Sequence, residues 1–301
     1  RNAMKGSVIP VYSGLPTVLQ ENGYCNLFFM THESQYDNMN AFLRTNGFDE
    51  IYAQENYPSE KVVNSFGVQD DFMYQYALPI LNERAGTGNP FFSVLLSISN
   101  HPPYVIPPYF HPHSDVLEEQ IVEYADWSIR QFMQAAEKQP WFDNTIFVFL
   151  GDHGKMVGTP ECEMPQSYNH IPLMIYGKDI KPGVYDGFGG QVDVSPTLLG
   201  LLNISYLQNN FGVNLLEEER PCMFFTADNL IGARDSVNMF IYSPDSQQEF
   251  KYKLEEGKLR AATGTDEEAF RNLKDYCFSM LQSTESLVKE HKTLDKVSVK
   301  K

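Results

Sequence analysis

The sequence has little positive charge, little cysteine and no long hydrophobic run, and each shortage excludes a class of protein. Its 301 residues carry 23 Lys and Arg against 39 Asp and Glu, a formal net charge of −16. Nucleic-acid-binding domains present a basic face to the phosphate backbone, so this balance argues against general binding of DNA or RNA. An acidic protein that acts on an anionic substrate needs a local cation, and a bound metal ion is one such cation.

Cysteines and apolar runs are also limited. The four cysteines are widely scattered and form no Cys-x-x-Cys pair, so neither a zinc ribbon nor a disulfide scaffold is indicated. No segment reaches the roughly 18 apolar residues that cross a bilayer. The chain begins Arg-Asn-Ala-Met, which is not a translation start, so we expect that a targeting or membrane segment could have been removed from its N-terminal side.

Apolar runs of strand length alternate with helical patterns along the first two-thirds of the chain. We predict strands, each preceded by Gly, Pro, Asn or Asp, at 26–30, 91–99, 145–150 and 173–176. Runs this apolar are typical of strands covered on both faces, as in a parallel α/β sheet. Helices are predicted at 15–21, 70–84, about 118–138 and about 193–202. Asp193 or Ser195 is expected to cap the last of them.

The sequence pattern changes after about residue 220. Short apolar runs at 223–226, 237–242 and 250–254 are separated by turn sequences such as Pro-Asp-Ser and Glu-Glu-Gly, which indicates an antiparallel meander. A final charged helix is predicted from about 266 to 291. We therefore expect an α/β catalytic core over residues 1–220 and a C-terminal meander plus helix over 221–301.

The strongest chemical signal is an Asp-His pair after the strand predicted at 145–150. Ligands of open α/β sheets bind at the carboxyl ends of strands, where Asp152 and His153 lie, and Gly154 lets the backbone turn. A carboxylate oxygen and an imidazole nitrogen together suit Zn²⁺ or Mn²⁺. An Asp-His dipeptide alone would be ordinary loop sequence, but its position after a buried strand favours a metal site.

Three further histidines lie near predicted strand ends. His101 follows the strand at 91–99, where it can bind an anionic oxygen or donate a proton. His32 follows the first strand, and His170 precedes the fourth. Each of these alone is equally well explained as a structural or loop histidine. The arrangement of four of the seven histidines at strand ends favours a functional site.

These motifs in this order resemble the sulfatase/alkaline-phosphatase superfamily, and more narrowly its lipoteichoic acid synthase and phosphoglycerol transferase branch. The resemblance spans roughly residues 10–220 and rests on stretches such as Ser-Asn-His-Pro-Pro-Tyr, Leu-Gly-Asp-His-Gly, Tyr-Asn-His-Ile-Pro-Leu and Gln-Val-Asp-Val-Ser-Pro-Thr. It implies an α/β fold of the alkaline-phosphatase type, with a mainly parallel sheet between helices, a small C-terminal antiparallel sheet and a final helix.

The resemblance also implies a cofactor and residue roles. Asp152 and His153 would hold one divalent metal, Mn²⁺ foremost, with Mg²⁺ or Zn²⁺ as alternatives. His101 would be catalytic, and His32 and His170 would contact the substrate. The family's metal site also takes a Glu and a nucleophilic Thr, both expected upstream of Arg1. We therefore expect this chain to be the C-terminal two-thirds of a catalytic domain, inactive or severely impaired without that region.

The implied function is metal-dependent phosphoryl transfer on a lipid- or glycan-linked phosphodiester. It would take place at the extracytoplasmic face of a bacterial cell membrane or in the periplasm, with membrane tethering through a missing N-terminal region. Lipoteichoic acid synthases present an arginine to glycerol phosphate where this chain reads Tyr36-Asp37-Asn38-Met39, so the head group or acceptor can differ. The alternatives are sulfate-ester hydrolysis, since tetrahedral anions look alike to a metal site, and a non-catalytic extracytoplasmic binding domain.

Overall fold

The chain divides into two compact units, Arg1–Thr145 and Ile146–Lys301. The structure is a computed structural model that describes residues 4, 9, 11–264, 267–290 and 292–293. None of the helices it describes is long and apolar enough to cross a membrane. The predicted boundary at residue 220, between a catalytic core and a meander, stays a prediction.

A three-stranded parallel sheet forms the centre of the first unit. Its strands are ordered β2-β1-β5, with bounds β1 Cys25–Met30, β2 Glu50–Tyr52 and β5 Phe91–Leu96. The helices of this unit are α1 Leu15–Glu21, α2 Met39–Thr45, α3 Asp70–Gly86 and α4 Leu117–Ala136. A small antiparallel pair, β3 Val62–Asn64 and β4 Gly67–Val68, completes it.

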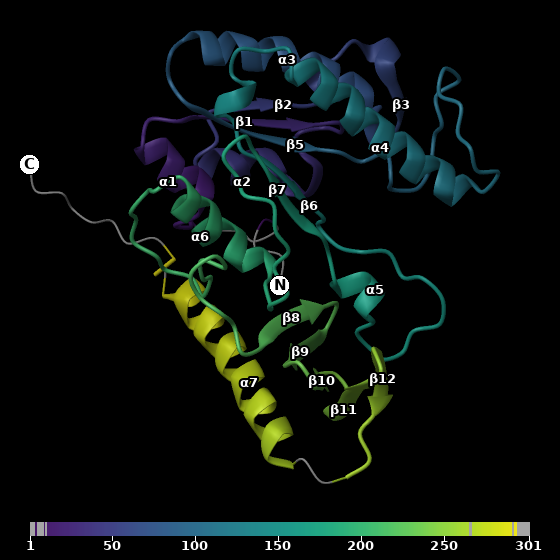
Figure 1. The fold of residues 1–301 in the computed structure, drawn as a ribbon, viewed down its shortest axis with the longest axis vertical. Coiled ribbons are helices and arrows are strands. Elements are labelled where there is room, and N and C mark those ends of the chain that lie inside the picture. Colours follow the sequence, from purple (N-terminus) through teal and green to yellow (C-terminus); the bar gives the residue numbers. More distant parts are fainter. Residues whose placement is uncertain (1–3, 5–8, 10, 265–266, 291, 294–301) are drawn as a thin grey trace, which may run out of the picture. The chain divides into compact units, whose positions relative to one another are not determined.

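Side chains of β1 alternate between two apolar layers. Leu27 and Phe29 are fully buried and belong to a cluster that includes residues of α3 and α4, which lie side by side in Figure 1. Phe28 and Met30 point to the opposite face, where they pack with Leu43 of α2. Helices therefore cover both faces of the sheet, as the continuous apolar sequence of the strand predicted.

The second unit begins with two strands that pair with each other. They are β6 Phe147–Leu150 and β7 Leu173–Tyr176, and their pairing is antiparallel, with Leu150 opposite Leu173. The apolar runs had indicated parallel strands, and for this pair that expectation was wrong. The connection from 151 to 172 contains only the short helix α5 Gln166–Asn169, and it returns the chain directly alongside β6.

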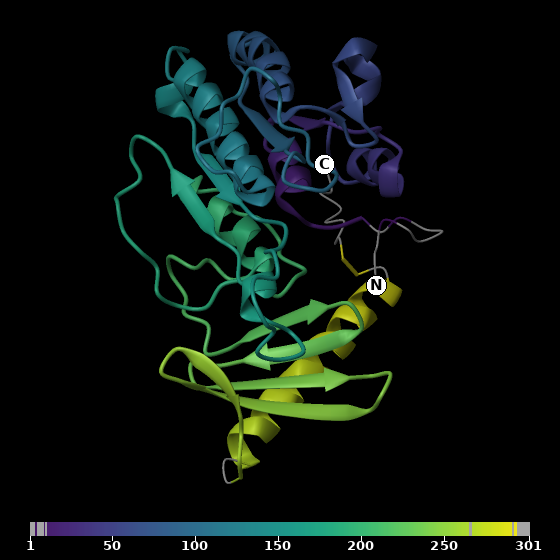
Figure 2. The same cartoon turned by 90° about the vertical axis from the view of Figure 1, so that its right-hand side faces the viewer.

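A five-stranded antiparallel meander and a long helix form the rest of the second unit. The strands follow one another in space as β12-β11-β10-β9-β8, with bounds β8 Met223–Ala227, β9 Leu230–Arg234, β10 Asn238–Ser243, β11 Gln248–Glu255 and β12 Lys258–Ala261. Helix α7, Glu267–Lys289, lies across this sheet in Figure 2 and packs Phe270, Leu273 and Cys277 into its core. The predicted meander and final helix are confirmed, although β9 and β12 were not anticipated.

Helix α6, Gln191–Leu201, starts before both residues expected to cap it. Its N-cap is Gly190, and Asp193 occupies the third helical position. The Asp193 carboxylate accepts the Gly190 N–H at 2.8 Å, so it still satisfies a backbone donor at the helix start. Asp193 is fully buried and pairs with Arg220, which accounts for a carboxylate in an apolar interior.

Candidate active site

Asp152 and His153 lie in the turn that follows β6, as the sequence predicted. Asp152 Oδ1 accepts the His153 N–H at 2.8 Å, and Asp152 Oδ2 lies 3.7 Å from His153 Nε2. His153 Nδ1 is 2.8 Å from the Gly154 carbonyl oxygen. Because a carbonyl can only accept, Nδ1 of the neutral ring carries the proton and Nε2 keeps its lone pair beside the carboxylate. The two side chains are 78% and 53% exposed.

This pair fits two ligands of a divalent cation. Two ligand atoms about 2.1 Å from one tetrahedral ion are roughly 3.4 Å apart, close to the observed separation of 3.7 Å. The hydrogen bond from Nδ1 to a backbone carbonyl is also the usual way in which a metal-ligating histidine is oriented. Within the described part of the chain, no group of three or more His, Cys, Asp or Glu side chains could hold a metal. That Asp152 and His153 are metal ligands stays a prediction, and these two residues alone would not complete a coordination sphere.

Backbone and amide contacts fasten the Asp152–His153 turn. The Gly154 N–H donates to the Tyr168 carbonyl at 2.8 Å, and the His153 ring stacks on the Tyr168 ring with centroids 5.0 Å apart. Gln191 Nε2 donates to the carbonyl oxygens of Gly151 at 3.1 Å and Asp152 at 2.8 Å. A Cβ on Gly154 would lie 2.1 Å from the Ser167 carbonyl oxygen, so this close approach requires glycine.

Three of the predicted site residues line one open cavity of about 1320 Å³ in the second unit. Asp152, His153 and His170 all line it. His170 follows α5, and its N–H donates to the Gln166 carbonyl at 2.8 Å. Two arginines also line the cavity, Arg220 and Arg234, and sequence reasoning missed both. Neither arginine lies in one of the sequence motifs described above, and Arg234 lies within the meander, so no local pattern marked them.

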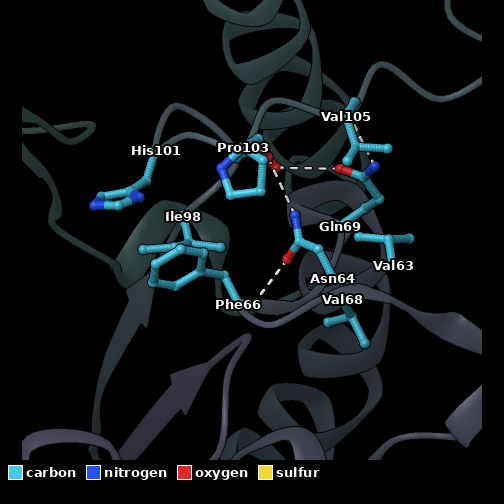
Figure 3. A pocket seen from close by; sticks show the side chains of 10 residues that line it. Val63, Asn64, Phe66, Val68, Gln69, Ile98, His101, Pro103 and Val105 are labelled. Carbon is cyan, nitrogen blue, oxygen red and sulfur yellow. Dashed lines mark hydrogen bonds between the residues drawn. The ribbon is translucent and has the colours of Figure 1, made fainter.

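His101 lies in the turn after β5, in the first unit. Its N–H donates to the Ile98 carbonyl at 2.8 Å, and its Nδ1 is 2.7 Å from the Pro102 carbonyl oxygen. The exposed ring packs against Phe66, with centroids 4.5 Å apart, and in Figure 3 it lies on the side of the turn away from Gln69. The enclosed space beside it measures only about 10 Å³, which is room for about one water.

Buried carboxylates hold the His101 turn in place, and sequence reasoning missed them. Asp70, the first residue of α3, accepts the N–H groups of Ile98 at 2.9 Å and Ser99 at 3.1 Å. It is 1% exposed, and this burial raises the pKa of Asp70. The available signal was a pair of adjacent acids at a predicted helix start, because acidic residues are common in first turns.

The neighbouring Asp71 anchors Tyr109, in the segment that follows the His101 turn, and Tyr124 of α4. Its carboxylate accepts hydrogen bonds from the hydroxyls of Tyr109 at 2.8 Å and Tyr124 at 2.5 Å. Burial, together with the bond to Asp71, raises the pKa of Tyr109 to about 12. Both tyrosines therefore remain protonated donors across the ordinary pH range.

His32 is buried at the end of β1, with 3% of its surface exposed. Its Nδ1 is 2.9 Å from the Glu33 carbonyl oxygen, and its ring lies 5.0 Å from that of Tyr36. The same local arrangement occurs at His32, His101 and His153. In each, Nδ1 faces the carbonyl of the following residue, and Nε2 is left for another partner. The convergence of these histidines with Asp152 and His170 into a single site stays a prediction.

Comparison with known proteins identifies the family. Residues 4–204 match the Sulfatase family. Lipoteichoic acid synthase 1 of Bacillus subtilis is 24% identical over 83% of this chain, and Phosphoglycerol transferase I of Xanthomonas campestris pv. campestris is 25% identical over 79%. These matches cover 42% and 36% of the two relatives, so this chain spans about two-fifths of their length.

Solved structures give the same assignment of the fold. An alkaline phosphatase superfamily protein from Vibrio parahaemolyticus is similar with a TM-score of 0.81 and 25% identity, over 95% of this chain and 70% of that one. The lipoteichoic acid synthase LtaP from Listeria monocytogenes is similar with a TM-score of 0.76 and 24% identity, over 95% and 74%. The predicted fold class and resemblance are therefore confirmed, and the chain belongs to the sulfatase family, with lipoteichoic acid synthases and phosphoglycerol transferases among its relatives.

Proposed function

We propose that this chain carries the metal-binding part of a phosphotransferase of the lipoteichoic acid synthase and phosphoglycerol transferase type. The proposed substrate is a lipid- or glycan-linked phosphodiester. Family membership supports phosphoryl or sulfuryl transfer in general. The observation that carries the proposal is the Asp152–His153 pair, in which an oriented imidazole lone pair and a carboxylate oxygen lie 3.7 Å apart on an exposed turn.

The proposed cofactor is one divalent cation held by Asp152 Oδ2 and His153 Nε2, with Mn²⁺ foremost. When bound, such an ion neutralises charge on phosphoryl oxygens and lowers the pKa of a hydroxyl nucleophile. The Gly154 carbonyl keeps His153 in the tautomer that leaves Nε2 unprotonated. Gln191 holds the two carbonyls of the turn and so limits its movement.

The proposed role of His101 is to contact a phosphoryl oxygen or to protonate the leaving group. Its Nδ1 faces the Pro102 carbonyl, so Nε2 is the nitrogen available to a substrate. Donation from Nε2 while Nδ1–H keeps its bond to Pro102 requires the doubly protonated ring. His32 and His170 are proposed to contact the substrate, and the nucleophile is left unassigned.

The proposed setting is the extracytoplasmic face of a bacterial cell membrane or the periplasm, with a membrane tether outside these residues. The family resemblance supports this setting. An anionic lipid or glycan would then be presented at the membrane surface, and the local cation would offset the acidic charge of the chain.

Metal binding tests the core of this proposal. We expect titration with Mn²⁺ to give one site per chain, and the substitutions D152N and H153A each to weaken it by about 100-fold or more. The control H111A removes an exposed histidine of the first unit to which no role is assigned, and it should bind Mn²⁺ like the parent chain. Stoichiometric metal in H153A, measured by elemental analysis, would contradict the assignment.

Turnover by the full-length protein then separates the chemistries. We expect cleavage of a glycerol phosphodiester and an aryl phosphate, both dependent on Mn²⁺ and on His153. Preferential cleavage of an aryl sulfate would favour sulfate-ester hydrolysis. The absence of both metal and turnover would favour a non-catalytic binding domain.

A further inference from the structure

We propose that Arg234 forms a second oxyanion subsite in the cavity of the second unit, where it binds a phosphate or sulfate group other than the one at Asp152 and His153. Arg234 is the last residue of β9 and lines the same cavity as that pair. One of its terminal nitrogens donates to Gln166 Oε1 at 2.6 Å, and its guanidinium lies 5.9 Å from the centre of the Phe188 ring. Three separate segments of the chain therefore set its orientation.

Charge balance distinguishes Arg234 from Arg220, the other arginine of this cavity. The Arg220 side chain is 9% exposed and donates through Nε to both carboxylate oxygens of Asp193, at 2.9 and 2.8 Å. Its terminal nitrogen also donates to the Phe211 carbonyl oxygen. The fold therefore neutralises Arg220 internally, which leaves it little capacity to bind an external anion.

Arg234 forms no ion pair of this kind among the residues that the structure describes, although the charge of the neighbouring Asp235 partly favours the cation. The hydrogen bond of its side chain goes to a neutral amide oxygen. The nearby Asp235 carboxylate accepts instead from the backbone N–H groups of Val237 at 2.7 Å and Asn238 at 2.6 Å. Burial lowers the pKa of Arg234, which reports a cation that has lost part of its hydration. A bound oxyanion would replace the hydration that the buried guanidinium has lost.

The available donors suit a tetrahedral oxyanion. A guanidinium carries five N–H groups in a planar fork that binds phosphate in a bidentate manner, and Gln166 occupies one of them. Because Gln166 Oε1 faces Arg234, its Nε2 amide is left as a further donor. The carboxylates that line the cavity, Asp152, Asp186, Glu219 and Asp228, repel anions, so an anion would bind at the arginine rather than elsewhere on this wall.

The position of α5 separates this subsite from the Asp152–His153 turn. Arg234 contacts Gln166, and His153 stacks on Tyr168, two residues further along the same helix. Residues two apart on a helix point to different sides, and a helix with its side chains is about 10 Å across. One tetrahedral group does not span both positions. The subsite would therefore take a second anionic group of the substrate, an assignment that rests on the proposed function.

Phosphate binding in the absence of metal tests the subsite independently of the metal pair. In EDTA and low salt, we expect the 301-residue chain to bind inorganic phosphate with a millimolar dissociation constant, measured by calorimetric or NMR titration. R234Q should weaken this affinity about tenfold or more. R260Q is the matched control, because Arg260 is an exposed residue of β12 whose loss changes the net charge equally. Equal effects of R234Q and R260Q, or no phosphate binding by the parent chain, would overturn the subsite.

Two further variants keep the outcomes distinguishable. If R234Q does not fold, R234K serves, since lysine retains the charge but loses the fork. We then expect weaker phosphate binding than in the parent chain, and unchanged binding would overturn a bidentate guanidinium site. H153A should retain phosphate affinity under EDTA while losing Mn²⁺. If H153A instead binds Mn²⁺ normally and R234Q alone loses phosphate, the subsite stands and the proposed metal site fails.

Discussion

Two histidine-bearing turns follow strands β5 and β6, and the fold holds them differently. The sequence predicted buried strands, but the side chains of β5 and β6 are only partly buried, and Leu150 at the end of β6 is 43% exposed. The His101 turn is fastened by Asp70, a buried carboxylate that accepts the N–H groups of Ile98 and Ser99. The Asp152–His153 turn is held by backbone contacts, the Gln191 amide and the stacking of His153 on Tyr168, and its carboxylate is exposed. The His101 turn is therefore anchored by a buried carboxylate of α3, whereas the Asp152–His153 turn carries its own exposed carboxylate beside a histidine.

The two turns therefore differ in the contacts that hold their backbone conformation. Hydrogen bonds from a buried carboxylate to backbone donors persist without any ligand, because breaking them would leave buried polar groups unsatisfied. An exposed carboxylate next to an imidazole gains little from that contact in water. A cation shared by Asp152 and His153 would add the missing constraint. We therefore expect that the fold alone positions His101, and that a bound metal would complete the positioning of His153.

The largest expected effect comes from exchanging the two carboxylates for alanine. D70A should lower the free energy of unfolding of the first unit by about 3 kcal/mol, since two buried N–H groups lose their acceptor. D152A, at an exposed position, should cost less than about 0.5 kcal/mol. Urea denaturation followed by tryptophan fluorescence measures the first effect directly, because both tryptophans, Trp127 and Trp141, lie in the first unit. Equal losses in the two variants would remove the distinction between the turns.

Metal should stabilise one unit and not the other. With free Mn²⁺ at 100 times its dissociation constant, binding adds about 2.7 kcal/mol to the unit that holds it. We expect hydrogen exchange to slow around residues 151–154 and 166–170, with no change around 97–103. H153A should abolish the protection. Protection that spreads equally over the His101 turn would contradict a metal site confined to Asp152 and His153.

Gln191 should matter for metal affinity although it is not a proposed ligand. Q191A removes two hydrogen bonds to the carbonyls of the Asp152–His153 turn, and loss of such a supporting contact weakens metal binding about tenfold. Q282A, on the exposed surface of α7, is the control. Calorimetric titration with Mn²⁺ compares them, and identical affinities would show that the turn is ordered without Gln191.

The smallest effect concerns pH. Burial raises the pKa of Asp70 in the folded state, so folding favours its protonated form. The stabilisation is complete below the unfolded pKa of about 3.9 and is lost as the pH rises through the folded value. D70N cannot ionise, so the parent chain should lose stability relative to D70N over this range. Parallel stability curves for the two proteins would show that Asp70 has an ordinary pKa.

Local sequence features predicted the longer elements and both turns, but not the short helices α2 and α5 or the short strands β2, β3 and β4. Helix α1 has the predicted bounds of 15–21, because Gly14 and Pro16 mark its start and Gly23 marks its end. The two turns were found because an apolar strand followed by polar residues is a local pattern. Strands β9 and β12 were missed, since Gly232 and the charged residues of 258–260 weaken the strand pattern.

The residues that sequence reasoning missed act through distant partners. Asp70 contacts Ile98, which is 28 residues away in the sequence, and Asp71 contacts Tyr124, which is 53 residues away. Arg234 contacts Gln166, which is 68 residues away in the sequence. No periodicity or spacing encodes these contacts, because tertiary packing alone brings the partners together. A buried carboxylate and a surface carboxylate at a helix start look the same in sequence.

The position of a bound metal ion would show most directly whether Asp152 and His153 are ligands. Crystals of the protein grown with Mn²⁺ and measured at the manganese absorption edge would give an anomalous difference peak. We predict one peak about 2.2 Å from both an Asp152 carboxylate oxygen and His153 Nε2. A peak bonded to His153 Nδ1, or a fully loaded crystal with no peak at this turn, would rule out a metal held by Asp152 and His153 Nε2.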